Sequence, residues 1–220
     1  MSDDDAQLRP ATGESPDSDE QLARRARQGC RDSFGELARR YQTRLLRYLH
    51  RYIRSTADAE DVLQETFVRA FQRLNQYDQT RSFGTWLFTL AHRLAVSHHR
   101  RALVAARATE IVGQRVRSQE AAEPGNPLAD QEAREFFWAK AAAVLSEEQL
   151  CATWLFYVEQ MPAPQIAEVL GRTWVSVKTI LFRARRKLAP ILAEFAGMEQ
   201  NSPNVSPAPG VGRSAAWVTV

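Results

Sequence analysis

The chain has 220 residues, of which 44% are hydrophobic and 25% charged. This length fits one domain or two small ones, and the composition excludes collagen-like and wholly disordered chains. No apolar run reaches the ~20 residues of a membrane-spanning helix, and the acidic N-terminus lacks the apolar segment of a secretory signal. Cys30 and Cys151 are too few for a disulfide framework, so we expect a cytoplasmic protein without membrane insertion.

The net charge of +3 hides an uneven distribution along the chain. Residues 21–101 carry sixteen arginines against seven acidic residues, and residues 149–220 are also net basic. The stretch between these two blocks is net acidic, as are the first twenty residues. Two basic blocks are typical of a protein that contacts a polyanion, most often nucleic acid, although solvated helix faces give the same balance.

The first half of the chain has the apolar spacing of amphipathic helices and shows no strand pattern. Residues 1–19 have the acidic, polar composition of a disordered tail. One helical signal then runs from about 20 to 54, and a second helix starts near Asp58, which is expected to cap it. A third helix starts at Phe83 and ends near Arg101. Together these segments predict a compact helical bundle.

The second half begins with a linker and continues with shorter helices. Residues from about 102 to 128 lose the helical periodicity and contain a Pro- and Gly-rich stretch, and the linker is predicted to span 103–132. Ser146 and Gln149 have the spacing of a capping box at the start of a helix. Gly171 is expected to end a short helix in the left-handed conformation, and Thr173 is expected to cap the helix that follows.

A short helix, a glycine turn and a longer basic helix form the pattern of a helix-turn-helix. In that motif the second helix lies in the major groove of DNA. Val175 and Phe182 are predicted to point outward from this helix. The candidate DNA-binding residues on it are Thr173, Trp174, Ser176, Lys178, Thr179, Arg183 and Arg186. An ordinary helical hairpin with a basic end stays open as the alternative.

A second basic stripe lies on the helix that starts at Phe83, opposite its apolar stripe. Such a face can hold phosphates and reach base edges, although a solvated face has the same pattern. The polar loop 75–82 and nearby aromatic side chains could hold a base that has left the stack, or Phe83 and Trp86 could simply be core. The candidate DNA-binding residues here are Asn75, Trp86, Arg93, Ser97, Arg100 and Arg101.

The sequence shows no set of residues that would carry catalysis. It has no nucleophile motif, no glycine-rich phosphate loop and no supported pair of carboxylates. His92, His98 and His99 lack a carboxylate or thiol to complete a metal site, so we expect no metal, no cofactor, no small-molecule substrate and no enzyme activity. An acidic helix face suited to a protein partner is formed by Asp58, Asp61, Gln64 and Glu65.

These residues resemble a known family in two separate blocks. Residues 58–71 and 83–91 resemble region 2 of extracytoplasmic-function (ECF) sigma factors of the sigma-70 family. Residues 165–171 and 177–188 are similar to their region 4. The two blocks occur in the family's order and with a linker between them, which is far more specific than a lone helix-turn-helix.

The resemblance implies an all-α protein with two small helical domains joined by a flexible linker. Region 2 would span 20–102 and region 4 would span 133–196, followed by a disordered tail, 197–220. Such a protein binds core RNA polymerase, here through the acidic helix face, and directs promoter-specific transcription initiation. Region 2 would open the minus-10 element of promoter DNA and region 4 would read the minus-35 element. An anti-sigma factor would be the usual inhibitor.

The chain departs from the family pattern at several positions. Arg93 stands where the family usually has Asn, and Ser97 where it has Asp. Ile180 stands where Arg is common, and Trp174 and Val175 could either contact thymine methyl groups or pack on a partner. These departures keep open the hypothesis of a sigma-like interaction protein that has lost promoter reading. The basic helix-turn-helix itself keeps open a stand-alone regulator, for instance a repressor.

Overall fold

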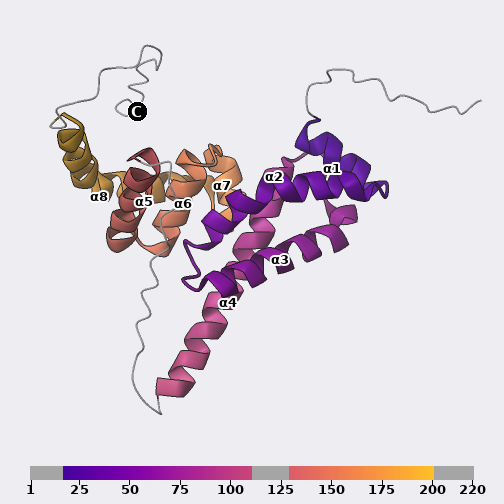
Figure 1. The fold of residues 1–220 in the computed structure, drawn as a ribbon, viewed down its shortest axis with the longest axis horizontal. Helices are drawn as coiled ribbons and strands as arrows, with labels where there is room; N and C mark the ends of the chain where they lie inside the picture. Colours follow the sequence, from indigo (N-terminus) through magenta and orange to yellow (C-terminus); the bar gives the residue numbers. More distant parts are fainter. Residues whose placement is uncertain (1–16, 111–128, 201–220) are drawn as a thin grey trace, which may run out of the picture.

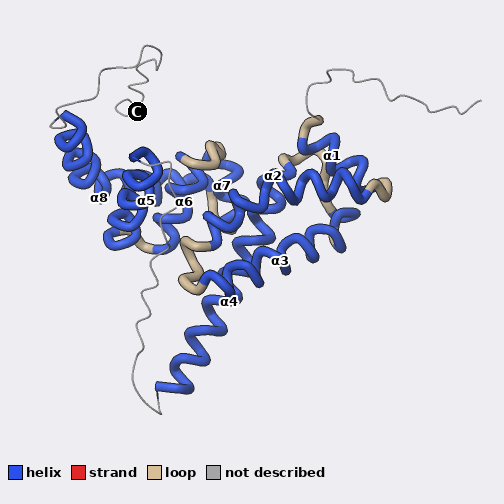
Figure 2. The backbone as a smooth tube through the Cα atoms, in the orientation of Figure 1, coloured by secondary structure: helices blue, strands red, loops and turns tan. Residues whose placement is uncertain are grey.

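The computed structural model describes residues 17–110 and 129–200, and in those ranges it contains helices and no strands. The all-α prediction is therefore confirmed (Figures 1 and 2). The elements are α1 (Asp19–Arg27), α2 (Arg31–Leu49), α3 (Thr56–Gln72), the short 3₁₀ helix η1 (Leu74–Gln76), α4 (Phe83–Glu110), α5 (Ala129–Val144), α6 (Glu147–Tyr157), α7 (Ala163–Leu170) and α8 (Trp174–Gln200).

The predicted single helix over 20–54 is in fact two helices, α1 and α2. Gly29 lies between them with a φ of +102°, a backbone conformation that glycine adopts without steric cost. The chain therefore turns there, and α1 packs back against α2. Periodicity alone missed this break because apolar residues on both sides of Gly29 face the same core.

The start of α3 also differs from the prediction. Asp58 does not cap the helix; Ser55 does, because its side-chain oxygen accepts a hydrogen bond from the Asp58 amide at 3.3 Å. Asp58 lies instead in the first turn, where a negative charge interacts favourably with the helix dipole. Serine and aspartate are comparable caps, and sequence alone could not rank them here.

Helical structure extends beyond three predicted boundaries. Helix α4 continues to Glu110 and α5 begins at Ala129, so both ends of the predicted linker are helical. Helix α8 continues to Gln200, past the boundary predicted at 196. The predicted tails lie mostly outside the described residues, as does the middle of the linker.

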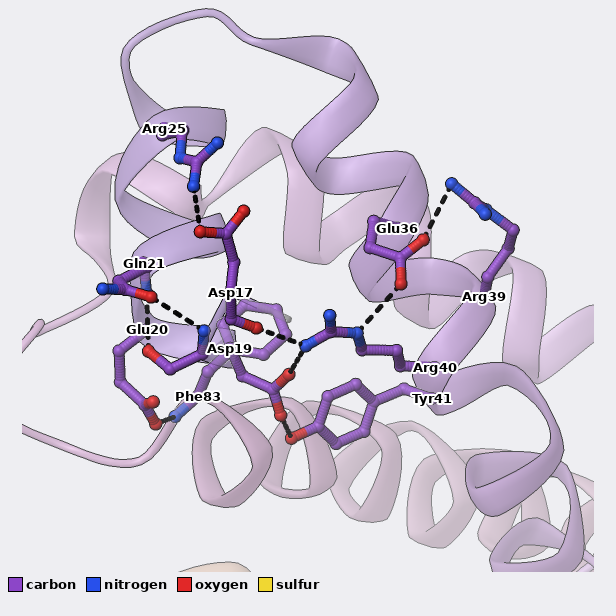
Figure 3. Close-up of polar contacts among 11 residues, drawn as sticks. Asp17, Asp19, Glu20, Gln21, Arg25, Glu36, Arg39, Arg40, Tyr41 and Phe83 are labelled. Carbon is purple, nitrogen blue, oxygen red and sulfur yellow. Dashed lines mark hydrogen bonds and ion pairs between the residues drawn. The ribbon is translucent and has the colours of Figure 1, made fainter. Parts of the chain in front are cut away.

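Helix α1 is attached to α2 and to the start of α4 by charged side chains (Figure 3). The Asp19 carboxylate accepts hydrogen bonds from the Tyr41 hydroxyl at 2.5 Å and from the Arg40 guanidinium at 2.9 Å. The Glu20 carboxylate accepts one from the Phe83 amide at 3.4 Å. Burial and the Asp19 carboxylate together raise the pKa of Tyr41 above its usual range. This attachment fixes where α4 begins.

We expect Gly84→Ala to disturb this attachment, because an added Cβ would lie 2.8 Å from the Tyr41 hydroxyl oxygen. Moving Tyr41 would weaken its bond to Asp19, so the free energy of unfolding should fall by about 1–3 kcal/mol. Urea denaturation measures this. Gly35→Ala is the matched control: nothing lies within 4 Å of its Cβ, and alanine favours the helix by up to ~1 kcal/mol. Equal effects of the two changes would contradict the prediction.

The local signals of the second half are found as predicted. The Ser146 side chain accepts from the Gln149 amide, and the Gln149 side chain accepts from the Ser146 amide, which completes the capping box. Gly171 ends α7 in the left-handed conformation, with a φ of +63°. The Thr173 hydroxyl accepts from the Ser176 amide at 3.2 Å and so caps α8.

The two helical units, α1–α4 and α5–α8, share a continuous hydrophobic core. One buried cluster contains Leu87 and Phe88 of α4 together with Leu155 of α6 and Ile166 of α7. Helix α7 packs directly against α4. A smaller cluster joins α5, α6 and α8. The units therefore contact each other closely rather than standing apart.

Candidate nucleic-acid interface

Helices α7 and α8 form the predicted helix-turn-helix. Ile166 and Leu170 of α7 pack with Val177 and Leu181 of α8, and all four are buried. The turn between the helices is set by the left-handed Gly171 and by the Thr173 cap. This packing fixes which face of α8 is turned away from the protein.

The predicted DNA-binding residues of α8 lie on that outer face. The Lys178 ammonium nitrogen is 4.5 Å from the centroid of the Trp174 ring, so the two side chains form a cation–π pair. Ser176 is only partly exposed. The exposed candidates are Thr173, Trp174, Lys178, Thr179, Arg183 and Arg186.

The basic stripe predicted on the first unit is exposed along α4. Arg93, Ser97, Arg100 and Arg101 are all exposed. The Arg101 guanidinium donates to the Ser97 carbonyl at 3.4 Å, which keeps it close to the helix. The stripe thus presents three arginines and a hydroxyl without a carboxylate among them, an arrangement suited to phosphate.

The two aromatic residues beside the polar loop have different environments. Phe83 is 1% exposed and belongs to the core. Trp86 is only partly buried, with its ring centroid 5.2 Å from that of Tyr77 and 5.7 Å from that of Phe83. Asn75 is exposed in η1. Trp86 therefore keeps accessible ring surface for a stacked base, whereas Phe83 does not.

The acidic face predicted for a protein partner lies on α3. Asp61 and Gln64 are exposed, while Asp58 and Glu65 are partly exposed. Glu65 pairs with Arg69 of the same helix at 2.5 Å, and Asp58 lies 3.8 Å from the His98 ring. Asp61 and Gln64 are thus the most accessible polar groups of this set.

Across residues 17–110 and 129–200, no three His, Cys, Asp or Glu side chains gather in a way that would hold a metal ion. None of the helices in those ranges is long and apolar enough to cross a membrane.

Comparison with known families decides what this arrangement is. The family described as Sigma-70 region 2 matches residues 37–103, and the family described as Sigma-70, region 4 matches residues 139–188. Together the two matches cover more than half of the chain, one in each helical unit. The chain belongs to the ECF group of the sigma-70 family.

Similar proteins agree with this assignment. The ECF sigma factor BldN of Streptomyces coelicolor is 29% identical over 178 residues, which are 80% of this chain and 66% of BldN. CnrH, solved in complex with the cytosolic domain of CnrY, is 25% identical with a TM-score of 0.55, covering 84% of this chain and all of CnrH. RpoE of Bartonella quintana, solved with the anti-sigma factor NepR, shares the fold at 21% identity and a TM-score of 0.59, covering 73% of this chain and 96% of RpoE.

Among the described residues, two arginine–glutamate ion pairs join region 2 to region 4, in addition to the contact of 3.4 Å between the His99 ring and the Glu147 carboxylate. The Arg44 guanidinium lies 2.7 Å from the Glu159 carboxylate, whose side chain is only 2% exposed. The Arg81 guanidinium, at the end of the polar loop, lies 2.6 Å from the Glu168 carboxylate of α7. The second pair ties the loop proposed to hold a base to the first helix of the helix-turn-helix.

A buried cluster lies at the same boundary. Cys151 of α6 is fully buried in the same hydrophobic cluster as Tyr48 of region 2, and Tyr52 of region 2 packs against that cluster. Burial raises the pKa of this thiol above its usual range. The Arg51 guanidinium stacks 4.6 Å from the ring centroid of Trp154 in region 4. The Cys151 thiol is therefore covered partly by region 2.

His92 lies in the interior of the protein. The sequence groups it with His98 and His99 as a possible metal ligand, but it is buried, and its Nδ1 atom is 2.9 Å from the Tyr48 hydroxyl. Burial is the main cause that lowers the pKa of His92 to about 4, and the positive charges of Arg93 and Arg172 act in the same direction, while Glu148 opposes them. His92 is therefore a neutral packing residue near pH 7.

This low pKa predicts a pH-dependent stability. The unfolded chain binds a proton at His92 near pH 6.5, whereas the folded chain binds it only near pH 4. The free energy of unfolding should therefore be unaffected by His92 above pH 6.5 and should decrease as the pH falls toward 4, by about 3 kcal/mol in all. Urea denaturation between pH 7 and 5 measures the slope. His92→Gln should flatten it, and an unchanged slope in this variant would contradict the assignment.

Sequence reasoning missed the residues that join the two regions and the apolar part of the recognition helix. Arg81 was inside the polar loop, but its partner lies 87 positions away, and no local pattern connects them. Val175 and Phe182 were predicted to point outward yet were not counted as site residues. Their spacing with Thr179, at four and three residues, was the signal that could have found them.

Proposed function

We propose that this sigma factor uses α8 to read the upstream promoter element and the α4 stripe with Trp86 to open the start-proximal element. The observation that carries this proposal is that one chain exposes two basic, hydrogen-bonding faces on two different helical units. Arginine suits both faces because its planar fork pairs with phosphates and base edges. A lone helix-turn-helix regulator has no use for the second face.

The acidic face of α3 is the proposed contact with core RNA polymerase. Asp61 and Gln64 are accessible there, and the Glu65–Arg69 pair leaves part of the Glu65 carboxylate exposed. Because this face of α3 is acidic and polar rather than basic, it offers the negative charge that a basic partner would recognise. Its contact residues are Asp58, Asp61, Gln64 and Glu65.

Promoter binding requires regions 2 and 4 to separate. Elements centred about 10 and about 35 base pairs upstream are about 25 base pairs apart, or about 85 Å along B-form DNA. In the structure Arg81 of the loop contacts Glu168 of α7. Thr173, at the start of the recognition helix, follows Glu168 by only five residues, so it lies at most ~18 Å from Glu168. The loop and the recognition helix are therefore far closer than the two elements, and the compact arrangement is the state before promoter binding.

The remaining partners and properties follow the family. We infer an anti-sigma factor as the inhibitor, a cytoplasmic place of action, where core polymerase is found, and no enzymatic activity of the chain itself. The likeness to CnrH, solved with the cytosolic domain of CnrY, supports a regulatory partner of this kind.

Run-off transcription from genomic fragments tests the proposal, using core polymerase with and without the full-length chain. Transcripts that depend on the chain and share two promoter elements are the expected result. Polymerase binding without any dependent transcript would favour an interaction protein that has lost promoter reading. Tight duplex binding without polymerase, with a dissociation constant of about 10⁻⁸ M, would favour a stand-alone regulator.

Lys178→Ala combined with Arg183→Ala is expected to weaken use of the upstream element. Each side chain is exposed on α8 and would contribute one contact to DNA, so the loss should be about 10–100-fold in upstream-dependent transcription. Binding to core polymerase, measured by pull-down, should be unchanged. Loss of polymerase binding instead would show that α8 faces a protein.

A further inference from the structure

The face of α8 that is turned away from the core carries an unusual set of side chains at its centre. Residues buried against the core recur at Val177, Leu181, Ala184 and Leu188. The line of residues opposite to them, at steps of four, three and four, is Val175, Thr179, Phe182 and Arg186. Val175 is 55% exposed and Phe182 is 59% exposed. Two large apolar side chains therefore lie where a recognition helix meets the bases.

Thr179 adds to the apolar character of this line. Its hydroxyl donates a hydrogen bond to the Val175 carbonyl at 3.2 Å, back along the helix. The hydroxyl hydrogen is therefore already used within α8, and the side chain has a methyl group as its other branch. Val175, Thr179 and Phe182 thus expose an apolar surface, and the first charged hydrogen-bond donor along this line is Arg186.

Positive charge flanks the apolar line. Lys178 and Arg183 are exposed on either side of it, and Arg186 extends it toward the C-terminus. An apolar strip bordered by cations matches a surface that is hydrocarbon in the middle and phosphate at its edges. The major groove of DNA has this character wherever thymine occurs, because the thymine C5 methyl is the apolar group that bases present there.

We infer that Val175, Thr179 and Phe182 determine promoter specificity by contacting thymine methyl groups in the upstream element. This inference rests on the proposed function, in which α8 enters the major groove. It assigns base discrimination to van der Waals contact rather than to bidentate hydrogen bonds. Lys178 and Arg183 then hold the helix against the phosphates, and the strip selects sequences with thymine at the contacted positions.

Promoter duplexes that contain thymine or uracil at the same positions test this inference, because uracil differs from thymine only in lacking the C5 methyl group. Holoenzyme assembled from core polymerase and the full-length chain is used to select transcribing promoters from duplex DNA with a randomised upstream element. We expect thymine to be enriched at two or more positions. Replacing thymine with uracil at those positions should weaken promoter binding by about fourfold for each methyl contacted.

Variants assign the methyl contacts to this strip. Phe182→Ala should weaken binding to the thymine promoter. It should also bring the ratio of the affinities for the thymine and uracil promoters closer to one. The matched control is Leu192→Ala, since Leu192 is another exposed apolar residue of α8 but lies beyond Pro190. This control should keep the thymine-to-uracil ratio of the unmodified chain.

The possible failures are distinguishable. If thymine and uracil promoters bind equally while transcription still depends on the upstream sequence, the methyl-reading inference is wrong and the proposed function stands. If Phe182→Ala loses core polymerase and keeps the uracil penalty, the strip is a protein-docking surface and the inference is likewise wrong. If transcription ignores the upstream sequence altogether, the proposed function of α8 itself fails.

Discussion

Reversing the charge of Glu159 and Glu168, which pair with arginines of region 2, is expected to open the protein. Glu159→Arg and Glu168→Arg would place like charges opposite Arg44 and Arg81, where the structure has ion pairs of 2.7 and 2.6 Å. Each pair is worth up to about 1 kcal/mol, so losing both should favour separation by about 2 kcal/mol. The fraction of open molecules should then rise about 30-fold.

The native thiols report this opening directly. Cys30 is exposed, whereas Cys151 is buried in the cluster that contains Tyr48 of region 2. In a Cys30→Ser background, the rate at which a thiol reagent modifies Cys151 follows the open population. The double reversal should raise that rate about 30-fold. Binding to core polymerase should also raise it in the Cys30→Ser chain that carries no charge reversal.

Two further variants control for general loss of stability. Adding Arg44→Glu to Glu159→Arg restores opposite charges at one pair and should slow the modification of Cys151 again. Glu194→Arg breaks the 2.7 Å pair with Lys140, which lies within region 4. It should leave the Cys151 rate unchanged. If neither Glu159→Arg nor Glu168→Arg changed the rate of Cys151 modification, the role given to these pairs would be wrong.

Trp86→Ala is expected to slow promoter opening far more than initial promoter binding. Trp86 keeps accessible ring surface beside the exposed Asn75, and stacking on a base contributes about 1–3 kcal/mol. The opening rate should therefore fall about 5–100-fold. Fluorescence of 2-aminopurine placed in the start-proximal element measures opening, and a gel-shift assay at low temperature measures initial binding.

Trp86→Phe is the matched variant, because it keeps an aromatic face and the packing against Tyr77 and Phe83. It should retain most of the opening rate. An equal loss of binding and opening in Trp86→Ala would mean that this side chain acts mainly as core. Thermal unfolding of the same variants shows whether the fold is intact.

Sequence patterns predicted three of the local signals in the second half of the described chain, whereas the cap of α3 is Ser55 and not the predicted Asp58. The Ser146–Gln149 capping box, the left-handed Gly171 and the Thr173 cap were all predicted, because each depends on residues within three positions. The break at Gly29 was missed, because the helical period continues across it.

The site was predictable as a set of faces but not as a three-dimensional arrangement. Arg93 and Lys178 are exposed as their helical positions required. The burial of His92 depends on Tyr48, 44 positions away, and the Arg44–Glu159 pair joins residues 115 positions apart. Contacts between residues so far apart in the chain depend on how the helices pack, and no pattern among neighbouring residues of the sequence predicts them.

The core that α4 shares with α7 has a consequence for the chain while it is being made. About 60 residues separate the end of α4 from the end of α7, and ribosomes add about 5–20 residues per second. Region 2 therefore leaves the ribosome about 3–12 s before the helix that covers it. During that interval its α7-facing surface is uncovered, so this surface is accessible to other proteins before region 4 can cover it.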